Sequence, residues 1–191
     1  MRYHLLFVLL SLLVIGCGRG PNPGPPPSPV PDQVTATPTP SSPSPEAKKE
    51  APQVVTVDQD GNKLDLAEEY KKGTVLVYFY PKADTPGCTA QACSLRDSYE
   101  TLTDKGVTVI GVSLDGAEDQ KAFKAKYNLP FKLVPDTDRK MVDAFGVTHI
   151  AGAANREAFL IQDGQIVWHD ASASTSEQAA DVLAQLGEDK S

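Results

Sequence analysis

The chain has 191 residues, of which 25 are acidic and 18 are basic, so its formal net charge at pH 7 is −7. This negative charge, without any cluster of basic residues, argues against nucleic acid as a partner. The three histidines and three cysteines are scattered without a repeating metal-ligand spacing, which argues against a structural metal site.

The first predicted element is an export signal over residues 1–16. Arg2 and His4 form a short polar start, and Leu5–Ile15 is an apolar run with the length of a signal-peptide core, too short to span a membrane. The run leads into Gly16-Cys17, which resembles the processing site of bacterial lipoproteins. We therefore expect Cys17 to carry lipid and to hold an exported protein at the periplasmic or another extracytoplasmic face of a membrane. A plain secretory signal, in which Cys17 has no role, is the alternative.

Residues 17–52 differ in composition from the rest of the chain. Twelve of the sixteen prolines lie between Gly18 and Pro52, among Ser, Thr and Gly and few apolar residues. Such a segment cannot bury enough apolar surface to offset the entropy lost on ordering, so it is predicted to be a disordered tether. A ligand for a proline-binding module is the alternative. The tether is expected to lead into a single domain over residues 53–191, which is long enough for one hydrophobic core.

The domain is predicted to start with a β-hairpin and then to form a buried strand. Gln53–Val57 and Lys63–Leu66 flank Asp60-Gly61, a dipeptide typical of two-residue hairpin turns. A helical turn is expected over Leu66–Tyr70. The next run, Thr74–Tyr80, is short and rich in β-branched and aromatic residues, which indicates a buried strand.

A helix with a cysteine in its first turn is predicted directly after this strand. Thr85 is a suitable N-cap residue, and Pro86 suits the first helical position. Apolar residues then follow one helix face until Lys105-Gly106: Ala92, Leu95, Tyr99 and Leu102. Cys88 would lie where the free N–H groups and the positive end of the helix dipole favour a thiolate. A buried structural thiol is the alternative.

A second cysteine follows five residues later on the same predicted helix. On a regular α-helix Cys93 would be rotated by about 140° from Cys88, with the two Cα atoms roughly 8 to 9 Å apart. A disulfide needs a Cα separation of roughly 7 Å or less. The two sulfurs could therefore bond only after the first turns of this helix unwind.

The remaining predicted elements alternate strands with helices. Strands are expected over Val107–Ser113, Phe131–Val134, Glu157–Gln162 and Gln165–His169, and helices over Glu118–Tyr127, Asp138–Phe145 and Ser176–Leu186. Asp163-Gly164, between the last two strands, is a second hairpin signal. This order predicts an α/β fold, with a mixed sheet and helices on both faces.

The stretch around Cys88 resembles a known enzyme family. Pro81, Thr85 and Cys88 have the Pro-x-x-x-Thr-x-x-Cys spacing of peroxiredoxins. The wider run Tyr80–Asp97, with its second cysteine, is similar to the bacterioferritin comigratory protein or peroxiredoxin Q branch. The likeness extends over roughly Gln53–Gly187, and it implies a thioredoxin-like fold: a central mixed β-sheet flanked by helices, with an N-terminal β-hairpin.

The resemblance also implies a role for individual residues. Cys88 would be the peroxidatic nucleophile, Pro81 would shield its sulfur, and Thr85 would hydrogen-bond the peroxide. Arg156, just before a later strand, would stabilise the thiolate and the transition state. The sulfenic acid formed on Cys88 would condense with Cys93 of the same subunit to give a disulfide.

By this resemblance the protein would be an atypical two-cysteine peroxiredoxin that reduces hydrogen peroxide and organic hydroperoxides. A thioredoxin-like reductant would reopen the disulfide, and an exported enzyme would need such a reductant outside the cytoplasm. Neither a metal nor an organic cofactor would be required, and a monomer is expected. One departure concerns Glu157 and Ala158, which follow Arg156 where the family commonly has small hydroxylated residues.

Two other functions remain open from the sequence. An exported thioredoxin-like thiol-disulfide oxidoreductase would use Cys88 and Cys93 for exchange, and a copper-binding assembly factor would use them as soft ligands. The four residues between these cysteines differ from the spacing of either motif. Copper(I) retention that depends on both thiols, without peroxidase turnover, would favour the assembly factor.

Overall fold

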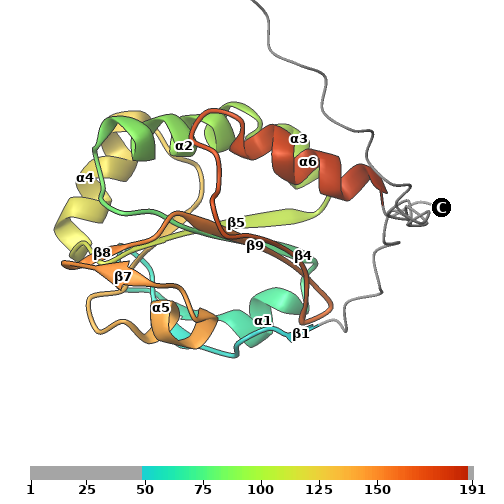
Figure 1. Cartoon of the computed structure of the whole chain (residues 1–191), viewed down its shortest axis with the longest axis horizontal. Helices are drawn as coiled ribbons and strands as arrows, with labels where there is room; N and C mark the ends of the chain where they lie inside the picture. The colour runs from blue at the N-terminus through green and yellow to red at the C-terminus, as the bar shows by residue number, and fades with distance from the viewer. Residues whose placement is uncertain (1–48, 189–191) are drawn as a thin grey trace, which may run out of the picture. The chain divides into compact units, whose positions relative to one another are not determined.

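The computed structural model of the chain describes residues 49–188 (Figure 1). Cys17, the predicted export signal and nearly all of the predicted tether lie outside the described residues. Within residues 49–188, no helix combines the length and the apolar character that a membrane crossing requires.

A six-stranded mixed sheet forms the centre of the domain. Its strands lie in the order β1-β10-β9-β4-β5-β6. They are β1 (Lys49–Glu50), β4 (Thr74–Phe79), β5 (Val107–Ser113), β6 (Lys132–Pro135), β9 (Glu157–Gln162) and β10 (Gln165–Asp170). Strand β4 pairs in parallel with β5 and antiparallel with β9, which confirms the predicted mixed sheet and its central strand.

Helices cover both faces of this sheet, as predicted. They are α1 (Leu66–Tyr70), α2 (Pro86–Asp97), α3 (Tyr99–Asp104), α4 (Ala117–Tyr127), α5 (Lys140–Phe145) and α6 (Gln178–Glu188). Successive β4 side chains point to opposite faces, so Leu76 and Tyr78 join a core with α2, α3, α4 and α6, whereas Val75 and Val77 join a core with α1 and α5. Figure 1 shows α2, α3 and α6 on one side of the sheet and α1 and α5 on the other.

The described residues contain three β-hairpins. One lies within the six-stranded sheet, and the other two form small sheets of their own. The first, β2 (Val55–Val57) with β3 (Lys63–Asp65), is the predicted N-terminal hairpin and forms a small sheet of its own. The second joins β9 to β10 through Asp163-Gly164, whose φ angles of 50° and 74° suit a two-residue turn. The third, β7 (His149–Ile150) with β8 (Ala153–Ala154), is not predicted by the sequence.

The domain begins earlier than the boundary predicted at Gln53. Residues Lys49–Glu50 form β1 and pair with β10, and the buried Ala51 donates its N–H to the carbonyl of Gly164 at 2.8 Å. The backbone groups along the outer edge of β10 need partners, and a two-residue strand supplies some of them. At least the last four residues assigned to the tether are therefore part of the fold.

The helix predicted up to Lys105 is interrupted. Helices α2 and α3 are separated by Ser98, whose backbone angles (φ −103°, ψ 10°) are not α-helical. Asp97 and Ser98 both have low helix propensity, which makes this the weak point of an otherwise continuous apolar face.

The last helix starts two residues later than predicted. Helix α6 begins at Gln178, so Ser176 lies before it. The Ser174 hydroxyl, rather than that of Ser176, accepts a hydrogen bond from the N–H of Glu177 at 2.8 Å. The segment leading into α6 is thereby held by an earlier serine than the sequence indicates.

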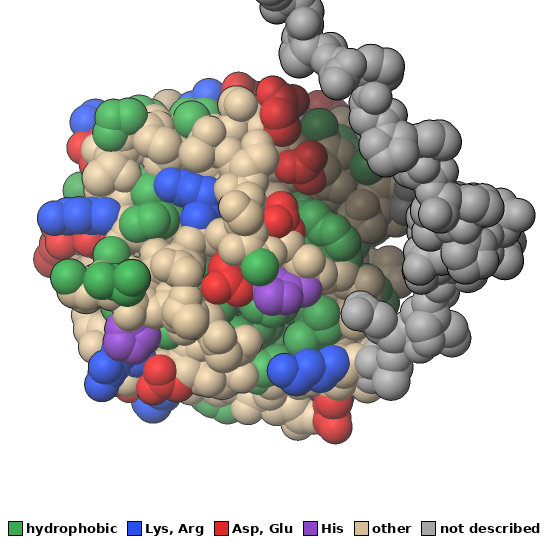
Figure 2. Space-filling model, viewed as in Figure 1, with side chains coloured by type: hydrophobic (Ala, Val, Ile, Leu, Met, Phe, Trp, Pro, Cys, Tyr) green, Lys and Arg blue, Asp and Glu red, His purple; other side chains and the backbone are tan. Residues whose placement is uncertain are grey.

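Charged side chains are mixed on the surface. On the face shown in Figure 2, acidic and basic residues are interspersed, and no broad basic area is present there. This distribution agrees with the negative net charge of the chain.

Candidate active site

The C-terminal end of β4 carries the candidate nucleophile. Thr85 occupies the N-cap position of α2 with extended backbone angles (φ −92°, ψ 153°), and Pro86 is the first helical residue. Cys88 follows in the first turn and is only 1% exposed. The predicted placement of this thiol at a helix N-terminus is confirmed. The Thr85 side chain makes no capping hydrogen bond, because its hydroxyl donates to the carbonyl of Lys82 at 3.0 Å.

A chain of polar groups holds the loop between β4 and α2. The N–H of Ala83 and the hydroxyl of Ser113 each donate to Oδ2 of Asp115 at 2.7 Å. Behind them, Nε2 of Gln120 donates to the Ser113 hydroxyl at 2.7 Å, and the Tyr80 hydroxyl donates to Oε1 of Gln120. Burial raises the pKa of Tyr80, so its hydroxyl stays a donor. The loop that carries Pro81 and Thr85 is thus fixed to β5 and α4.

The start of α2 is also tied to α4 on the surface. Asp84 has a left-handed backbone (φ 57°), and its carboxylate accepts hydrogen bonds from Nζ of Lys126 and from the Tyr127 hydroxyl. These two bonds hold the pKa of Asp84 below its ordinary value. Between this loop and α4 lies a cavity of about 250 Å³, whose lining includes Lys82 and Asp119.

Arg156 is the charged group at the cysteine. Its Nη2 lies 3.4 Å from Sγ of Cys88, and its Nη1 donates to Oε1 of Gln91, one turn further along α2. Nε2 of Gln91 in turn donates to Oε1 of Gln178 at 2.7 Å. A guanidinium at this distance favours the ionised sulfur, since it carries a permanent positive charge. The structure brings Cys88 and Arg156 together from segments 68 residues apart.

The residue that follows Arg156 points away from the cysteine. Glu157 is buried, and its Oε2 lies 2.8 Å from Nε2 of His169. The His169 ring stacks on Phe159, with centroids 4.1 Å apart. Because side chains alternate along a strand, Glu157 and Phe159 face the α1 and α5 side, opposite to the site. The departure from the family pattern at Glu157 therefore lies on the face of β9 opposite to Cys88, whereas Ala158 packs in the same core as Cys88.

The second cysteine lies on intact helix. Cys93 is half-buried in α2, and Cys88 and Cys93 are both free thiols. Arg96 lies beside it: a hydrogen bond to Asp97 and, more weakly, the Cys93 sulfur raise the pKa of this guanidinium. The structure therefore represents the dithiol form.

Several predicted and unpredicted residues meet at this site. Pro81 is half-buried at the start of the loop, and among the described residues no hydrogen bond joins Thr85 to the Cys88 sulfur. Gln91 and Gln178 were not predicted from the sequence. Gln91 could have been found, because a residue three positions after Cys88 shares its helix face. No group of three His, Cys, Asp or Glu side chains within residues 49–188 could hold a metal ion.

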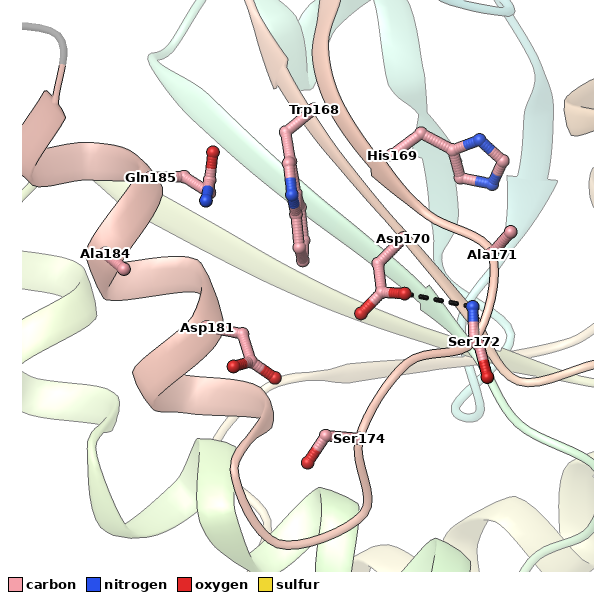
Figure 3. Close-up of a pocket in the computed structure, with 9 residues that line it drawn as sticks. All are labelled: Trp168, His169, Asp170, Ala171, Ser172, Ser174, Asp181, Ala184 and Gln185. Atoms are coloured by element: carbon pink, nitrogen blue, oxygen red, sulfur yellow. Dashed lines mark hydrogen bonds between the residues drawn. The ribbon is translucent and has the colours of Figure 1, made fainter. Parts of the chain in front are cut away.

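A larger groove lies between the end of β10 and α6 (Figure 3). It has a volume of about 490 Å³, and Trp168, Asp170 and Asp181 line it. Asp170 accepts a hydrogen bond from the N–H of Ser172 at 2.9 Å. Burial, followed by the neighbouring Asp170 and Glu177, raises the pKa of Asp181. Cys88 is not part of this lining.

The sequence matches the AhpC/TSA family over residues 47–169. It is 48% identical over 97 residues to a chloroplastic peroxiredoxin Q of Oryza sativa subsp. japonica, and this match covers 51% of the chain and 44% of that protein. The chain thus spans about half the length of the curated relatives that it matches.

Solved structures agree with the whole described fold. The peroxidoxin BcpB of Mycobacterium tuberculosis is 27% identical with a TM-score of 0.71, over 75% of this chain and 97% of that one. The bacterioferritin comigratory protein of Xanthomonas campestris, solved for insight into that protein's alkyl peroxide reduction activity, is 27% identical with a TM-score of 0.65, over 70% and 90% of the two chains. These similarities confirm the predicted thioredoxin-like fold.

Proposed function

The chain belongs to the AhpC/TSA family, in its peroxiredoxin Q and bacterioferritin comigratory protein branch, and on that premise we propose that it is a thiol-dependent peroxidase. The observation that supports this most directly is the 3.4 Å contact between Nη2 of Arg156 and the buried sulfur of Cys88 at the start of α2. The guanidinium and the helix N-terminus both favour the thiolate, which is the nucleophilic form of cysteine.

In the first step the Cys88 thiolate attacks one peroxide oxygen. An S–O bond forms as the O–O bond breaks, and the sulfur loses two electrons to become a sulfenic acid. The departing oxygen takes a proton and leaves as water or an alcohol. The Arg156 donors stabilise the negative charge that develops on the two oxygens. The Thr85 hydroxyl donates to Lys82 and keeps lone pairs free to accept the peroxide O–H.

In the second step Cys93 resolves the sulfenic acid. Its thiol displaces hydroxide from the Cys88 sulfur, so that a disulfide and one molecule of water are formed. The first turns of α2 unwind for this step, because a regular helix keeps the two sulfurs apart. A thioredoxin-like dithiol then reduces the disulfide by exchange and is itself oxidised to a disulfide.

Hydrogen peroxide and organic hydroperoxides are the proposed substrates. Support for the organic class comes from the alkyl peroxide reduction activity of the Xanthomonas campestris protein. Pro81, half-buried where β4 enters the loop, would shield the sulfur and shape the approach to it. Each turnover uses two cysteines of one subunit, so we propose that a monomer suffices and that no cofactor takes part.

The test is the reaction of the reduced full chain with hydrogen peroxide and with cumene hydroperoxide in a stopped-flow instrument. Trp168 is the only tryptophan and serves as the fluorescent reporter. We expect Cys88→Ser to abolish peroxide consumption. We expect Cys93→Ser to react once and to accumulate a sulfenic acid that dimedone traps. Peroxide consumption that persists in Cys88→Ser would refute the proposal.

We also propose that the enzyme is exported and anchored to a bacterial membrane through lipid on Cys17. The apolar run Leu5–Ile15 followed by Gly16-Cys17 supports this. Mass spectrometry of the protein from its native host should show Cys17 as a modified N-terminal residue. An unmodified N-terminus at another position would contradict the anchor and leave the peroxidase proposal untouched.

A further inference from the structure

We propose that Gln178, at the start of α6, is a positioning residue that orients Arg156 toward Cys88 through Gln91. This inference rests on the proposed peroxidase function and extends it to a residue 90 positions beyond the nucleophile. Gln178 touches neither sulfur nor peroxide in this scheme, and it acts through the side chain of Gln91.

The evidence is a directional chain of hydrogen bonds. Arg156 places Nη2 at the sulfur of Cys88 and donates from Nη1 to Oε1 of Gln91, while Nε2 of Gln91 donates to Oε1 of Gln178 at 2.7 Å. Both glutamine side chains are fully buried. Water therefore cannot reach either glutamine side chain, although Arg156 itself is only half-buried, and each amide must find its hydrogen bonds within the protein.

The direction of the chain is set by the arginine. A guanidinium can only donate, so Gln91 must present its oxygen to Arg156 and its nitrogen to Gln178. Gln178 must then present its oxygen, which leaves its own Nε2 without a partner among the described residues. An unpaired buried amide lowers folding stability. An apolar residue would fill this position without leaving an unpaired amide. Packing alone therefore does not account for Gln178, whose amide oxygen accepts the hydrogen bond from Gln91.

A second contact fixes the backbone that carries Gln178. The N–H of Ala179 donates to the Ser94 hydroxyl at 3.2 Å, so the first turn of α6 is capped by a side chain of α2. Gln91 and Ser94, neighbours on one face of α2, therefore hold Gln178 and Ala179 side by side. This arrangement gives Gln178 a fixed position from which to orient Gln91.

Loss of the Gln178 oxygen should loosen the arginine rather than unfold the protein. Gln91 would keep one partner and would be free to rotate about its side-chain bonds. The guanidinium would then sample positions in which Nη2 is further from the sulfur. Catalysis by pre-positioned donors is sensitive to such displacement, so the rate of peroxide attack should fall.

The first experiment compares three variants of the full chain. Gln178→Met keeps the side-chain length and removes both polar atoms, and Gln178→Glu keeps the acceptor. Gln185→Met is the matched control, because Gln185 lies two turns further along α6 and lines the groove of Figure 3. We expect the second-order rate constant with hydrogen peroxide to fall about tenfold in Gln178→Met and to stay within about twofold of wild type in the other two.

A double-mutant cycle tests the direction of the chain. In Gln91→Glu the carboxylate still accepts from Arg156, and Gln178 can turn its amide to donate, so the chain of hydrogen bonds is kept while the added negative charge beside the guanidinium lowers the rate by itself. Combining Gln91→Glu with Gln178→Glu places two acceptors against each other. The double variant should therefore be slower, by about tenfold or more, than the two single effects predict together.

Two controls separate this proposal from a structural role and from the peroxidase proposal itself. Urea unfolding shows whether Gln178→Met changes stability, and a wild-type rate in a destabilised variant would overturn the positioning role. Iodoacetamide alkylation of Cys88 in a Cys93→Ser background needs no peroxidase activity. If the protein does not react with peroxide but Gln178→Met slows the alkylation of Cys88, the peroxidase function is refuted and the positioning role is supported. Unchanged alkylation together with an unchanged peroxide rate would refute the positioning role.

Discussion

Gly87 determines how closely Arg156 can approach Cys88. A Cβ atom at this position would lie 3.2 Å from Nη2 of Arg156 and 3.4 Å from Cγ2 of Thr175. The first distance is tighter than an ordinary contact, so the absence of a side chain leaves room for the guanidinium next to the sulfur. Glycine is used here for close approach rather than for an unusual backbone angle.

Replacing this glycine by alanine should separate activity from stability. In Gly87→Ala the guanidinium must move by a few tenths of an ångström, so we expect the peroxide rate constant to fall by roughly threefold to tenfold. The unfolding free energy should be unchanged or higher by up to about 1 kcal/mol, because alanine favours a helix over glycine. Stopped-flow rates and urea unfolding measure the two effects. Gly187→Ala, a helical glycine with open space around it, is the control and should keep the wild-type rate.

Residues near each other in sequence were the predictable part of the site. Thr85, Pro86 and Cys88 could be placed because strand, cap and first turn follow one another along the chain. Arg156 was assigned by resemblance alone, and its 3.4 Å distance to the sulfur depends on how β9 packs beside β4. Gln178 has no local signal at all, since its partner Gln91 lies 87 residues away.

At the scale of whole elements, Glu69 ties α1 to β6. Its Oε1 accepts from Nζ of Lys72 at 3.0 Å and from Nζ of Lys132 at 2.9 Å. Burial alone would raise the pKa of Glu69, but the hydrogen bonds from Lys132 and Lys72 hold it below the ordinary value. The folded state therefore binds this proton less readily than the unfolded state does, and the carboxylate stabilises the fold when it is ionised.

The contribution of Glu69 should disappear in acid. Glu69→Gln is expected to lower the unfolding free energy at pH 7 by about 1 kcal/mol, a modest value because both lysines are largely exposed to water. The difference from wild type should shrink as pH falls below the unfolded pKa of about 4.5 and through the lower folded value. Urea unfolding at pH 7 and pH 3.5 measures this. Glu68→Gln, at an exposed pair with Lys71, should have little effect at either pH.

Elements with strong local signals were predicted well, and those formed by tertiary packing were not. Asp163-Gly164 predicted the β9–β10 hairpin correctly, because both residues have the positive φ angles of a two-residue turn. Asp60-Gly61 also indicated a hairpin, but β2 and β3 are joined by residues 58–62, where only Gly61 has a positive φ angle. The break at Ser98 interrupts a regular apolar face and leaves no periodic signal. Strand β1 was missed because two polar residues form a strand only where the edge of β10 offers partners.

At the scale of the whole molecule, we expect residues 49–52 to contribute to folding stability and residues 1–48 not to contribute. A chain lacking residues 1–48 retains β1, the buried Ala51 and the bond from the Tyr70 hydroxyl to the Pro52 carbonyl. We expect its unfolding free energy to equal that of the full chain. Removal of residues 1–52 discards all three features and should cost about 2 kcal/mol.

Urea unfolding of the two truncated chains beside the full chain is the measurement. Equal stability of the two truncated chains would show that β1 contributes nothing to the fold. A chain lacking residues 1–48 that fails to fold would show that the predicted tether has a structural role. Peroxide rates for the same proteins would show whether either cut reaches the site.

The position of β1 also decides where a mechanical load would enter the domain. If the protein is held at a membrane through Cys17, any pull along the chain reaches the fold at Lys49. Among residues 49–188, strand β1 pairs with β10 alone, and both β10 and β9 stand between it and β4. Force would detach the two residues of β1 from the edge of the sheet before it strained β4, the strand that leads to Cys88. Strand β1 would thus detach first, and the geometry around Cys88 would be kept.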